Sequence, residues 1–375
     1  MTLEPPHRTD AVIPSDPSDT PAAAADRPPV PAGEPARSAV LTGASGWLGQ
    51  NLVRALAGRD RVRCLVPRHE EVAPLALLSR AVEVVVGDVR HPAVVDELFE
   101  GVPAGATVFH AAAVIHPRSS TRELFDVNVG GTQNVVDRAR RAGAGRFVHV
   151  SSNSPFGVNP TPDDVFTESS PYHPYLAYGA SKHEAEQVVA AAAERGDLAT
   201  VTVRAPWFYG PHQPERQTRF LRAVRRGRFP LVGDGSQRRS MTYTGNLVRG
   251  LLRAEVADKA PGNAYWIADA RPYRLREVIT TVRRALEAEG LATSGPELLS
   301  LPLSAAAARL AEAVDRLAQG RGRYVQSLHV LGELRHTIAC DVDRARLELG
   351  YEPTVGLEEG MRASIRWCLD HGEQL

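Results

Sequence analysis

Lysine is almost absent from this sequence of 375 residues, because only Lys182 and Lys259 occur among its 44 Lys and Arg residues. Asp and Glu also number 44, so the formal net charge at pH 7 is zero. A balanced charge favours neither nucleic acid nor an anionic membrane as a partner. The expected partner is therefore a small molecule, neutral or anionic.

Cysteine is scarce as well. Cys64, Cys340 and Cys368 form no CxxC motif and no Cys/His cluster, which argues against structural zinc and favours a reducing compartment. No apolar run approaches the ~18 residues needed to cross a bilayer, and the N-terminus lacks the hydrophobic core of a signal peptide. We therefore expect a cytoplasmic protein without a metal.

Large apolar residues are nearly missing from the first 37 residues, which contain nine prolines and many Ala, Asp and Ser residues. Such a segment cannot bury enough apolar surface to offset the entropy lost on folding. Residues 1–37 are therefore predicted to be disordered.

From residue 38 onward, short β-branched runs alternate with longer amphipathic ones. The predicted strands are Ala39–Thr42, Val62–Val66, Val82–Val86, Thr107–His110, Phe147–Ser151 and Thr200–Val203. The predicted helices include Leu48–Ala57, Arg122–Ala142 and Ala177–Ala193. Each strand contains an all-apolar stretch, as strands covered on both faces require. The pattern predicts an α/β fold with a doubly wound parallel sheet, a Rossmann fold, over residues 38–205.

Beyond Pro206 the regular alternation ends, which predicts a smaller C-terminal cap over most of residues 206–375. Parts of residues 240–268 are expected to return to the Rossmann domain. Short pieces are expected at 220–226, 233–235, 246–254, 265–268 and 275–286. Helices are expected at 304–318 and 356–369, the second packed back on the cap.

A glycine motif, Gly43-Ala-Ser-Gly46-Trp-Leu-Gly49, directly follows the first predicted strand and opens the first helix. This is the context that a dinucleotide fingerprint requires. Gly43 permits the tight turn, Gly46 lets the backbone approach a pyrophosphate, and Gly49 allows close packing of helix on strand. The sequence therefore predicts nucleotide binding here.

Two charged residues follow the next strands. Arg68 stands near the position where a carboxylate would accept the ribose hydroxyls of NAD, and a guanidinium there suits the 2′-phosphate of NADP. A solvated surface arginine is the alternative. Asp88 could accept a hydrogen bond from the adenine amine, or it could simply form a turn.

The fourth and fifth strands end in small residues. The run Ala111–Ala113 would let a flat cofactor lie against the backbone, although plain packing is an alternative. Ser151 and Ser152 end the fifth strand at the carboxyl edge of the sheet, where ligands of open α/β folds bind. A serine hydroxyl there could hold a substrate carbonyl, or both serines could satisfy strand-end amides.

Tyr178 and Lys182 are four residues apart, which places both on one face of a helix. An ammonium near the phenol would favour the phenolate and lower the tyrosine pKa, so that Tyr178 could transfer a proton near neutral pH. The alternative is a solvated lysine beside a packing tyrosine.

Taken together, these motifs resemble the extended short-chain dehydrogenase/reductases from about Ala39 to Trp367. The matching features are Gly43-x-x-Gly46-x-x-Gly49, Asp88, His110-Ala-Ala-Ala113, Asn128-Val-Gly-Gly-Thr132, Ser151-Ser152, Tyr178-x-x-x-Lys182, Arg204-x-Pro206, Tyr209-Gly-Pro211 and Gly233-Asp-Gly235.

The resemblance implies hydride transfer at C4 of a nicotinamide, coupled to a proton relay. Tyr178 would be the general acid or base, Lys182 would lower its pKa and hold the nicotinamide ribose, and Ser152 would polarise the carbonyl. Asn128 matches the family's asparagine on the cofactor side, with an ordinary helix-start residue as the alternative.

The expected contacts of the site fall into two groups. The cofactor side comprises Gly43, Gly46, Trp47, Leu48, Gly49, Arg68, Asp88, Val89, Ala111, Ala112, Ala113, Asn128, Tyr178, Lys182 and Pro206. The substrate side comprises Ile115, Asn153, Phe156, Trp207, Phe208 and Arg239.

The tail points to one branch of the family. Arg323-Tyr324-Val325, His336-Thr-Ile-Ala-Cys-Asp341, Leu349-Gly-Tyr351-x-Pro353 and Leu357-Glu-Glu-Gly360 are similar to 3β-hydroxysteroid dehydrogenases and related 3-ketoacid reductases. Arg239 differs, because nucleotide-sugar epimerases place an arginine there on the substrate diphosphate. A free surface arginine is equally reasonable at this position.

The leading hypothesis is an NADP-dependent oxidoreductase, with NAD possible, acting on a ketone or secondary alcohol of a mainly apolar or polycyclic small molecule. The alternatives are an NAD-dependent nucleotide-sugar epimerase and a non-catalytic nucleotide-binding protein. In proteins that this chain resembles, helices corresponding to 122–142 and 177–193 often form a dimer interface, so a homodimer is expected.

Overall fold

A seven-stranded parallel sheet forms the centre of the chain in a computed structural model, which describes residues 33–118, 120–301 and 305–375. Its strands lie in the order β11-β6-β5-β4-β1-β2-β3. They are β1 (Ser38–Thr42), β2 (Arg61–Val66), β3 (Val82–Val86), β4 (Thr107–His110), β5 (Arg146–Ser152), β6 (Thr200–Ala205) and β11 (Ala264–Trp266). From β1 the chain adds β2 and β3 on one side, and from β4 it adds β5 and β6 on the other, so the strand order reverses between β1 and β4. In open α/β sheets, ligands bind in the crevice at the carboxyl ends of the strands at such a switch point.

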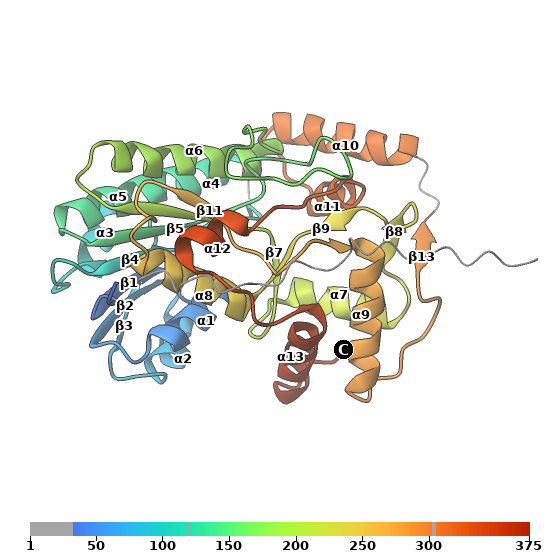
Figure 1. Cartoon of the computed structure of the whole chain (residues 1–375), viewed down its shortest axis with the longest axis horizontal. Coiled ribbons are helices and arrows are strands. Elements are labelled where there is room, and N and C mark those ends of the chain that lie inside the picture. The colour runs from blue at the N-terminus through green and yellow to red at the C-terminus, as the bar shows by residue number, and fades with distance from the viewer. Residues whose placement is uncertain (1–32, 119, 302–304) are drawn as a thin grey trace, which may run out of the picture.

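Helices cover both faces of this sheet (Figure 1). One face carries α3 (Pro92–Leu98), α4 (Arg122–Phe125), the π-helical turn η2 (Asp126–Gly131), α5 (Thr132–Arg141) and α6 (Leu176–Glu194). The other carries α1 (Trp47–Leu56), α2 (Val72–Ala76) and α8 (Thr244–Val256), with the short η1 (His69–Glu71) beside α2. The predicted Rossmann fold is confirmed.

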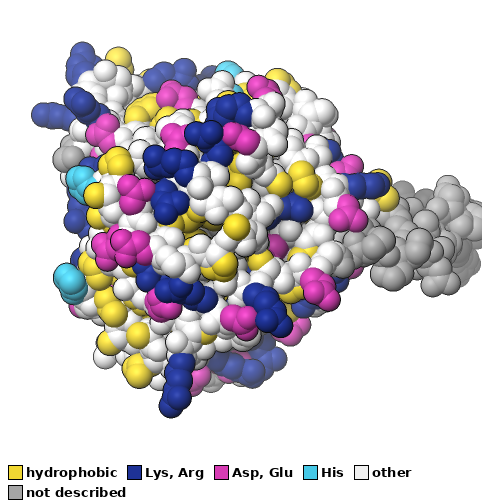
Figure 2. Space-filling model, turned by 90° about the vertical axis from the view of Figure 1, so that its left-hand side faces the viewer, with side chains coloured by type: hydrophobic (Ala, Val, Ile, Leu, Met, Phe, Trp, Pro, Cys, Tyr) yellow, Lys and Arg dark blue, Asp and Glu magenta, His cyan; other side chains and the backbone are white. Residues whose placement is uncertain are grey.

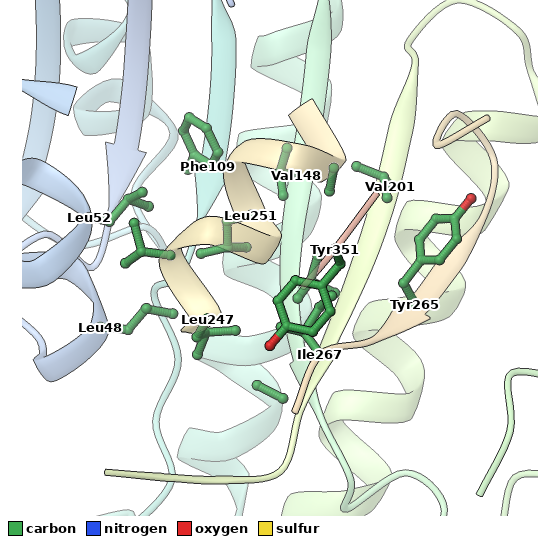
Figure 3. Packing of buried hydrophobic residues seen from close by; sticks show 14 of the residues in the cluster. Leu48, Leu52, Phe109, Val148, Val201, Leu247, Leu251, Tyr265, Ile267 and Tyr351 are labelled. Carbon is green, nitrogen blue, oxygen red and sulfur yellow. The ribbon is translucent and has the colours of Figure 1, made fainter. Parts of the chain in front are cut away.

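Helix α8 completes the layer that α1 and α2 form on one face of the sheet, although it comes from the second half of the chain. Its Leu247 and Leu251 lie between α1 and the central strands, and both are fully buried (Figure 3). Burying a leucine side chain stabilises a fold by about 1.5–3 kcal/mol. Together with β11, this helix fastens the second half of the chain to the sheet.

The cap has a separate apolar core. It contains α7 (Glu215–Arg225), α9 (Leu275–Ala288) and α13 (Leu357–Asp370), and α13 packs along α9 as predicted. Short strand pairs complete it: β7 (Trp207–Tyr209) with β10 (Met241–Tyr243), β9 (Arg238–Arg239) with β12 (Tyr273–Arg274), and β8 (Pro230–Val232) with β13 (Leu299–Leu301). Helix α12 (Asp343–Leu349), also in this half of the chain, packs against α8 and β11 instead.

Two further helices lie above the cap and reach α6. They are α10 (Ala305–Gly320) and α11 (Gln326–Leu334), which pack on each other, and α10 also contacts α6 (Figure 1). The helix predicted over 304–318 matches α10, except that Ser304 lies outside the described residues.

The predicted strands agree with the structure to within two residues at each end. The single helix predicted over Arg122–Ala142 contains the π-helical turn η2, which spacing alone did not indicate. Of the segment predicted to be disordered, residues 1–32 lie outside the described part, and the Gly33 amide donates to the Val256 carbonyl.

Acidic and basic side chains intermingle on the face shown in Figure 2, as a net charge of zero suggests. Across residues 33–118, 120–301 and 305–375, the structure contains no helix that is both long and apolar enough to span a membrane.

Candidate active site

The glycine turn after β1 allows no side chain at two of its positions. Gly43 has φ +74°, and a Cβ there would lie 2.7 Å from the backbone nitrogen of Ala112. A Cβ on Gly49 would overlap the Gly43 carbonyl oxygen. The turn therefore packs backbone on backbone, against the start of the Ala111–Ala113 run.

The N-terminus of α1 is suited to an anion. Gly46 is exposed, caps the helix without a side chain, and is followed by a first turn that contains no acidic residue. The first amides of a helix point outward and attract phosphate oxygens. A Cβ on Gly46 would meet only the Gly43 carbonyl oxygen, at 3.2 Å. The turn thus fits a dinucleotide pyrophosphate.

Trp47 and Leu48 have different surroundings. The Trp47 indole donates to the carbonyl of Pro211 at 2.8 Å, so it ties the glycine turn to the start of the cap. Its ring also packs on Phe208, with 4.9 Å between centroids. Leu48 is buried in the main core.

Arg68 and Asp88 lie at the carboxyl ends of β2 and β3, as predicted. The Arg68 side chain is 58% exposed and donates to Glu71 at 2.6 Å, so it is an exposed cation with an acidic neighbour. Burial raises the pKa of the Asp88 carboxyl, but hydrogen bonds from the Arg90 side chain and backbone outweigh it and hold the pKa below its ordinary value. Asp88 is therefore ionised at neutral pH.

Asn128 is buried within the continuous helical segment α4–η2–α5, so the interpretation as a helix-start residue was wrong. Its amide donates to the Val114 carbonyl at 2.9 Å and to the Ser181 hydroxyl at 3.0 Å, and its oxygen accepts from the Val114 amide. Asn128 thereby joins the loop after β4 to α6. Of the other expected cofactor residues, Val89 and Pro206 are buried.

Tyr178 and Ser152 are neighbours at the edge of the sheet. The Ser152 hydroxyl lies near enough to the phenol to lower the pKa of Tyr178, and Ser152 also accepts from the Ser154 amide at 3.2 Å. Ser151 instead donates to the buried carboxylate of Glu186. The two serines therefore differ, and only Ser152 faces the phenol.

Lys182 is 2% exposed, so the interpretation as a solvated lysine was wrong. Its Nζ donates to the Val150 carbonyl at 2.8 Å and lies 3.3 Å from His149 Nε2. Burial lowers the pKa of Lys182 to about 8. The ammonium is thus anchored beneath the end of β5.

The prediction that Lys182 lowers the pKa of Tyr178 was wrong for this arrangement. Burial of the phenol raises its pKa above the ordinary value, and the groups that act in the opposite direction are Ser152 and Arg216. Because burial raises the phenol pKa above its ordinary value near 10, Tyr178 keeps its proton at neutral pH.

The residues expected on the substrate side do not all lie together. Phe208 packs on Trp47 and Trp207 packs on Phe220, while Ile115 and Asn153 are half-buried in the loops after β4 and β5. Phe156 lies in the main core with the Arg204 guanidinium 4.4 Å from its ring.

Arg239 is 7% exposed and donates to the Glu333 carbonyl, so the interpretation as a free surface arginine was wrong. Sequence reasoning missed Arg216, His116 and His149, which the fold brings to this site. With so many arginines in the chain, no local signal distinguishes Arg216.

The pairing of this sheet with this Ser, Tyr and Lys group is that of the extended short-chain dehydrogenase/reductases, which are NAD(P)-dependent enzymes. The sequence model of the NAD dependent epimerase/dehydratase family matches residues 39–268. The chain belongs to this family.

Relatives extend the similarity over most of the chain. The uncharacterized protein y4nL of Sinorhizobium fredii is 42% identical over 89% of this chain and 96% of its own length. A Stigmatella aurantiaca protein named 4-hydroxy-2-methyl-3-oxo-4-farnesyl-3,4-dihydroquinoline-1-oxide ketoreductase is 32% identical over 86% and 94%. The 3beta-hydroxysteroid-dehydrogenase/decarboxylase isoform 1 of Arabidopsis thaliana is 31% identical over 88% and 80%.

Among solved structures, MoeE5 in complex with UDP-glucuronic acid and NAD is similar, with a TM-score of 0.66 and 26% identity. The similarity covers 89% of this chain and 99% of MoeE5. The predicted family and branch are thus confirmed.

Proposed function

We propose that this enzyme is an NADP-dependent oxidoreductase that interconverts a ketone and a secondary alcohol on a mainly apolar or polycyclic small molecule. The observation that carries the proposal is the position of Ser152 at the end of β5 beside the protonated Tyr178 of α6, at the carboxyl edge of the sheet. A hydroxyl pair of this kind can bind a carbonyl oxygen and donate a proton to it.

The chain supplies the proton and the positioning. Tyr178 keeps its proton at neutral pH, so in ketone reduction it acts as the general acid toward the substrate oxygen. Ser152 orients that oxygen by a second hydrogen bond. A bound nicotinamide cofactor would supply or accept the hydride. Lys182 lies one helical turn after Tyr178, and its ammonium would use a donor other than the one given to the Val150 carbonyl to hold the cofactor ribose.

The preference for NADP rests on Arg68. It lies just beyond the end of β2 and carries its charge at an exposed position. A 2′-phosphate would compete with Glu71 for the guanidinium, and two negative charges on a phosphate favour that exchange. The glycine turn itself serves either cofactor.

The preference for a ketone rests on the relatives. A protein named a ketoreductase and one named a 3β-hydroxysteroid dehydrogenase/decarboxylase are each about 30% identical over most of the chain. The burial of Arg239 weighs against the epimerase alternative, because its guanidinium already donates to the Glu333 carbonyl. A cytoplasmic location and a homodimer stay predictions.

A nicotinamide absorbance assay tests the proposal. Purified enzyme is mixed with NADPH or NADH and a panel of apolar ketones, 3-ketoacids, steroids and nucleotide sugars. We expect consumption of NADPH with an apolar or polycyclic ketone. Tightly retained NAD after purification, together with turnover of a UDP- or dTDP-sugar and no cofactor consumption, would instead identify an epimerase.

A further inference from the structure

His149 and Lys182 form a buried pair beside the active site. His149 lies on β5 and is fully buried, and its Nε2 is 3.3 Å from the ammonium nitrogen of Lys182 on α6. The same ammonium donates to the Val150 carbonyl at 2.8 Å. Because an ammonium has three N–H donors, these two contacts leave one N–H for a ligand.

The contact with Lys182 selects one tautomer of His149. An ammonium can only donate, so Nε2 of His149 accepts, and the neutral ring then carries its hydrogen on Nδ1. Within the described parts of the chain, that buried Nδ1 has no hydrogen-bond partner. A buried polar atom without a partner is unfavourable, so packing alone would favour an apolar residue at this position. The contact with Lys182 is what the imidazole adds.

His110 on the neighbouring strand has different contacts. It pairs in register with His149, and the two rings stack with 5.6 Å between their centroids. Both ring nitrogens of His110 contact hydroxyls, that of Thr42 at 2.7 Å and that of Thr132 at 2.9 Å. The hydrogen bonds of His110 are therefore made within the fold, whereas His149 is directed to Lys182.

The charged groups around the pair favour a neutral imidazole beside a charged lysine. Burial, followed by the charges of Lys182 and His110, lowers the pKa of His149 well below its ordinary value. Burial and the charge of Lys182 lower the pKa of His110 to about 3. The carboxylate that acts on Lys182 is Glu186, one turn further along α6, but it pairs with Arg204 of β6 at 2.8 Å. The hydrogen-bond acceptors of the ammonium are therefore neutral groups.

We propose that His149 is a positioning residue for Lys182: its neutral imidazole accepts one N–H of the ammonium and holds it, charged, at the end of β5 with one N–H left for the cofactor ribose. This inference rests on the proposed function, because it concerns how Lys182 holds the cofactor in the same site. His149 forms no bond to the substrate and acts through Lys182.

The scarcity of lysine makes a direct test possible. In full-length enzyme labelled with ¹³C at the lysine Cε, NMR detects only Lys182 and the exposed Lys259. A titration from pH 6 to pH 10 then measures the pKa of Lys182 without any turnover. The variants are His149→Leu, which removes the acceptor, and His149→Gln, which keeps an acceptor oxygen.

His183→Leu is the matched control. It removes the imidazole that follows Lys182 in the sequence, but that ring packs on Tyr172, with 4.2 Å between centroids. The Lys259 signal is the internal reference and should titrate alike in every protein.

The wild-type ammonium should titrate near pH 8. In His149→Leu the pKa of Lys182 should fall by about one pH unit, as for loss of a hydrogen bond to a charged group. His149→Gln should be intermediate, and His183→Leu should match the wild type. In the wild type, ¹⁵N NMR of the imidazole should show the hydrogen of His149 on Nδ1.

Cofactor binding supplies a second readout that a merely structural role would not change. Calorimetry measures the affinity for NADP⁺ at pH 6 and pH 8. Relative to the wild type, His149→Leu should bind NADP⁺ about fivefold more weakly at pH 8, where less of its Lys182 is charged, and within about twofold at pH 6. A residue that only fills space would cause the same loss at both pH values.

Three results would overturn the inference: an unchanged pKa of Lys182 in His149→Leu, an equal loss of NADP⁺ affinity at both pH values, or a hydrogen on Nε2 of His149 in the wild type. If His149→Leu does not fold, the tautomer in the wild type and the pKa of Lys182 in His149→Gln decide. If the wild type binds NADP⁺ but turns over no ketone or alcohol, the proposed function fails, while the titration of Lys182 still decides this inference.

Discussion

The backbone of Gly179 lies so close to the Ser154 carbonyl that a Cβ on Gly179 would be 2.5 Å from that oxygen. This contact sets the distance between α6 and the end of β5. Since Tyr178 precedes Gly179 on α6 and Ser152 ends β5, the same contact brings the two hydroxyls together.

Gly179→Ala should therefore push α6 away from the loop after β5. We expect a loss of about 1–3 kcal/mol in the free energy of unfolding and a drop of at least tenfold in kcat/KM, because small displacements of reacting groups are costly. Gly130→Ala is the matched control, since a Cβ there meets nothing within 4 Å. Activity of Gly179→Ala within twofold of the wild type would show that α6 adjusts freely.

Tyr178→Phe removes the proposed proton donor while keeping the ring. We expect kcat for ketone reduction to fall by about 10²–10⁴-fold, the usual contribution of general acid catalysis. NADPH affinity, measured by fluorescence, should change little. Turnover within about twofold of the wild type would exclude the phenol as the acid.

The raised pKa of Tyr178 also predicts how the rates of reduction and oxidation depend on pH. Burial raises the phenol pKa above its ordinary value near 10, so kcat/KM for ketone reduction should stay flat between pH 7 and 9. Oxidation of the alcohol requires the phenolate and should rise over the same interval. Initial rates in both directions at saturating cofactor measure this, so that titration of Lys182 near pH 8 does not limit cofactor binding. A fall in the rate of reduction between pH 7 and 8 under these conditions would contradict the assignment.

Arg68→Glu tests the NADP preference. The reversed charge should weaken NADPH binding at least tenfold and leave NADH binding within about threefold, because only NADPH carries the 2′-phosphate. Equal effects on both cofactors would refute the phosphate contact. Arg80→Glu, at an exposed arginine in the turn before β3, serves as a control for a change in surface charge.

The low pKa of His149 predicts that the folded protein loses stability as the pH falls. Burial, together with the charges of Lys182 and His110, holds its pKa well below 6.5. Below pH 6.5 the imidazole therefore binds a proton in the unfolded chain but not in the folded chain, so stability is lost as the pH falls. Relative to His149→Gln, the wild type should lose up to about 1.4 kcal/mol per pH unit between pH 6.5 and 5. Urea unfolding of the wild type and of His149→Gln at pH 6.5 and pH 5 measures this. An equal change in the free energy of unfolding for both proteins would contradict the prediction.

Much of the fold could be predicted from the sequence because strand and helix periodicities are local. Apolar runs such as Val82–Val86 identify buried strands, and the glycine spacing from Gly43 to Gly49 identifies the turn that only residues without a Cβ can form. The role of α8 was only partly evident, since its position under the sheet depends on contacts with α1.

The site was predicted less completely. The sequence by itself determined which chemical groups are present at Ser152, Tyr178 and Lys182, because a helical spacing and a strand end are enough to align them. Only the tertiary structure decided their charge states. Burial lowers the pKa of Lys182 and raises that of Tyr178, and Arg216 from the cap acts on the phenol, since pKa values depend on desolvation and on neighbours distant in the chain.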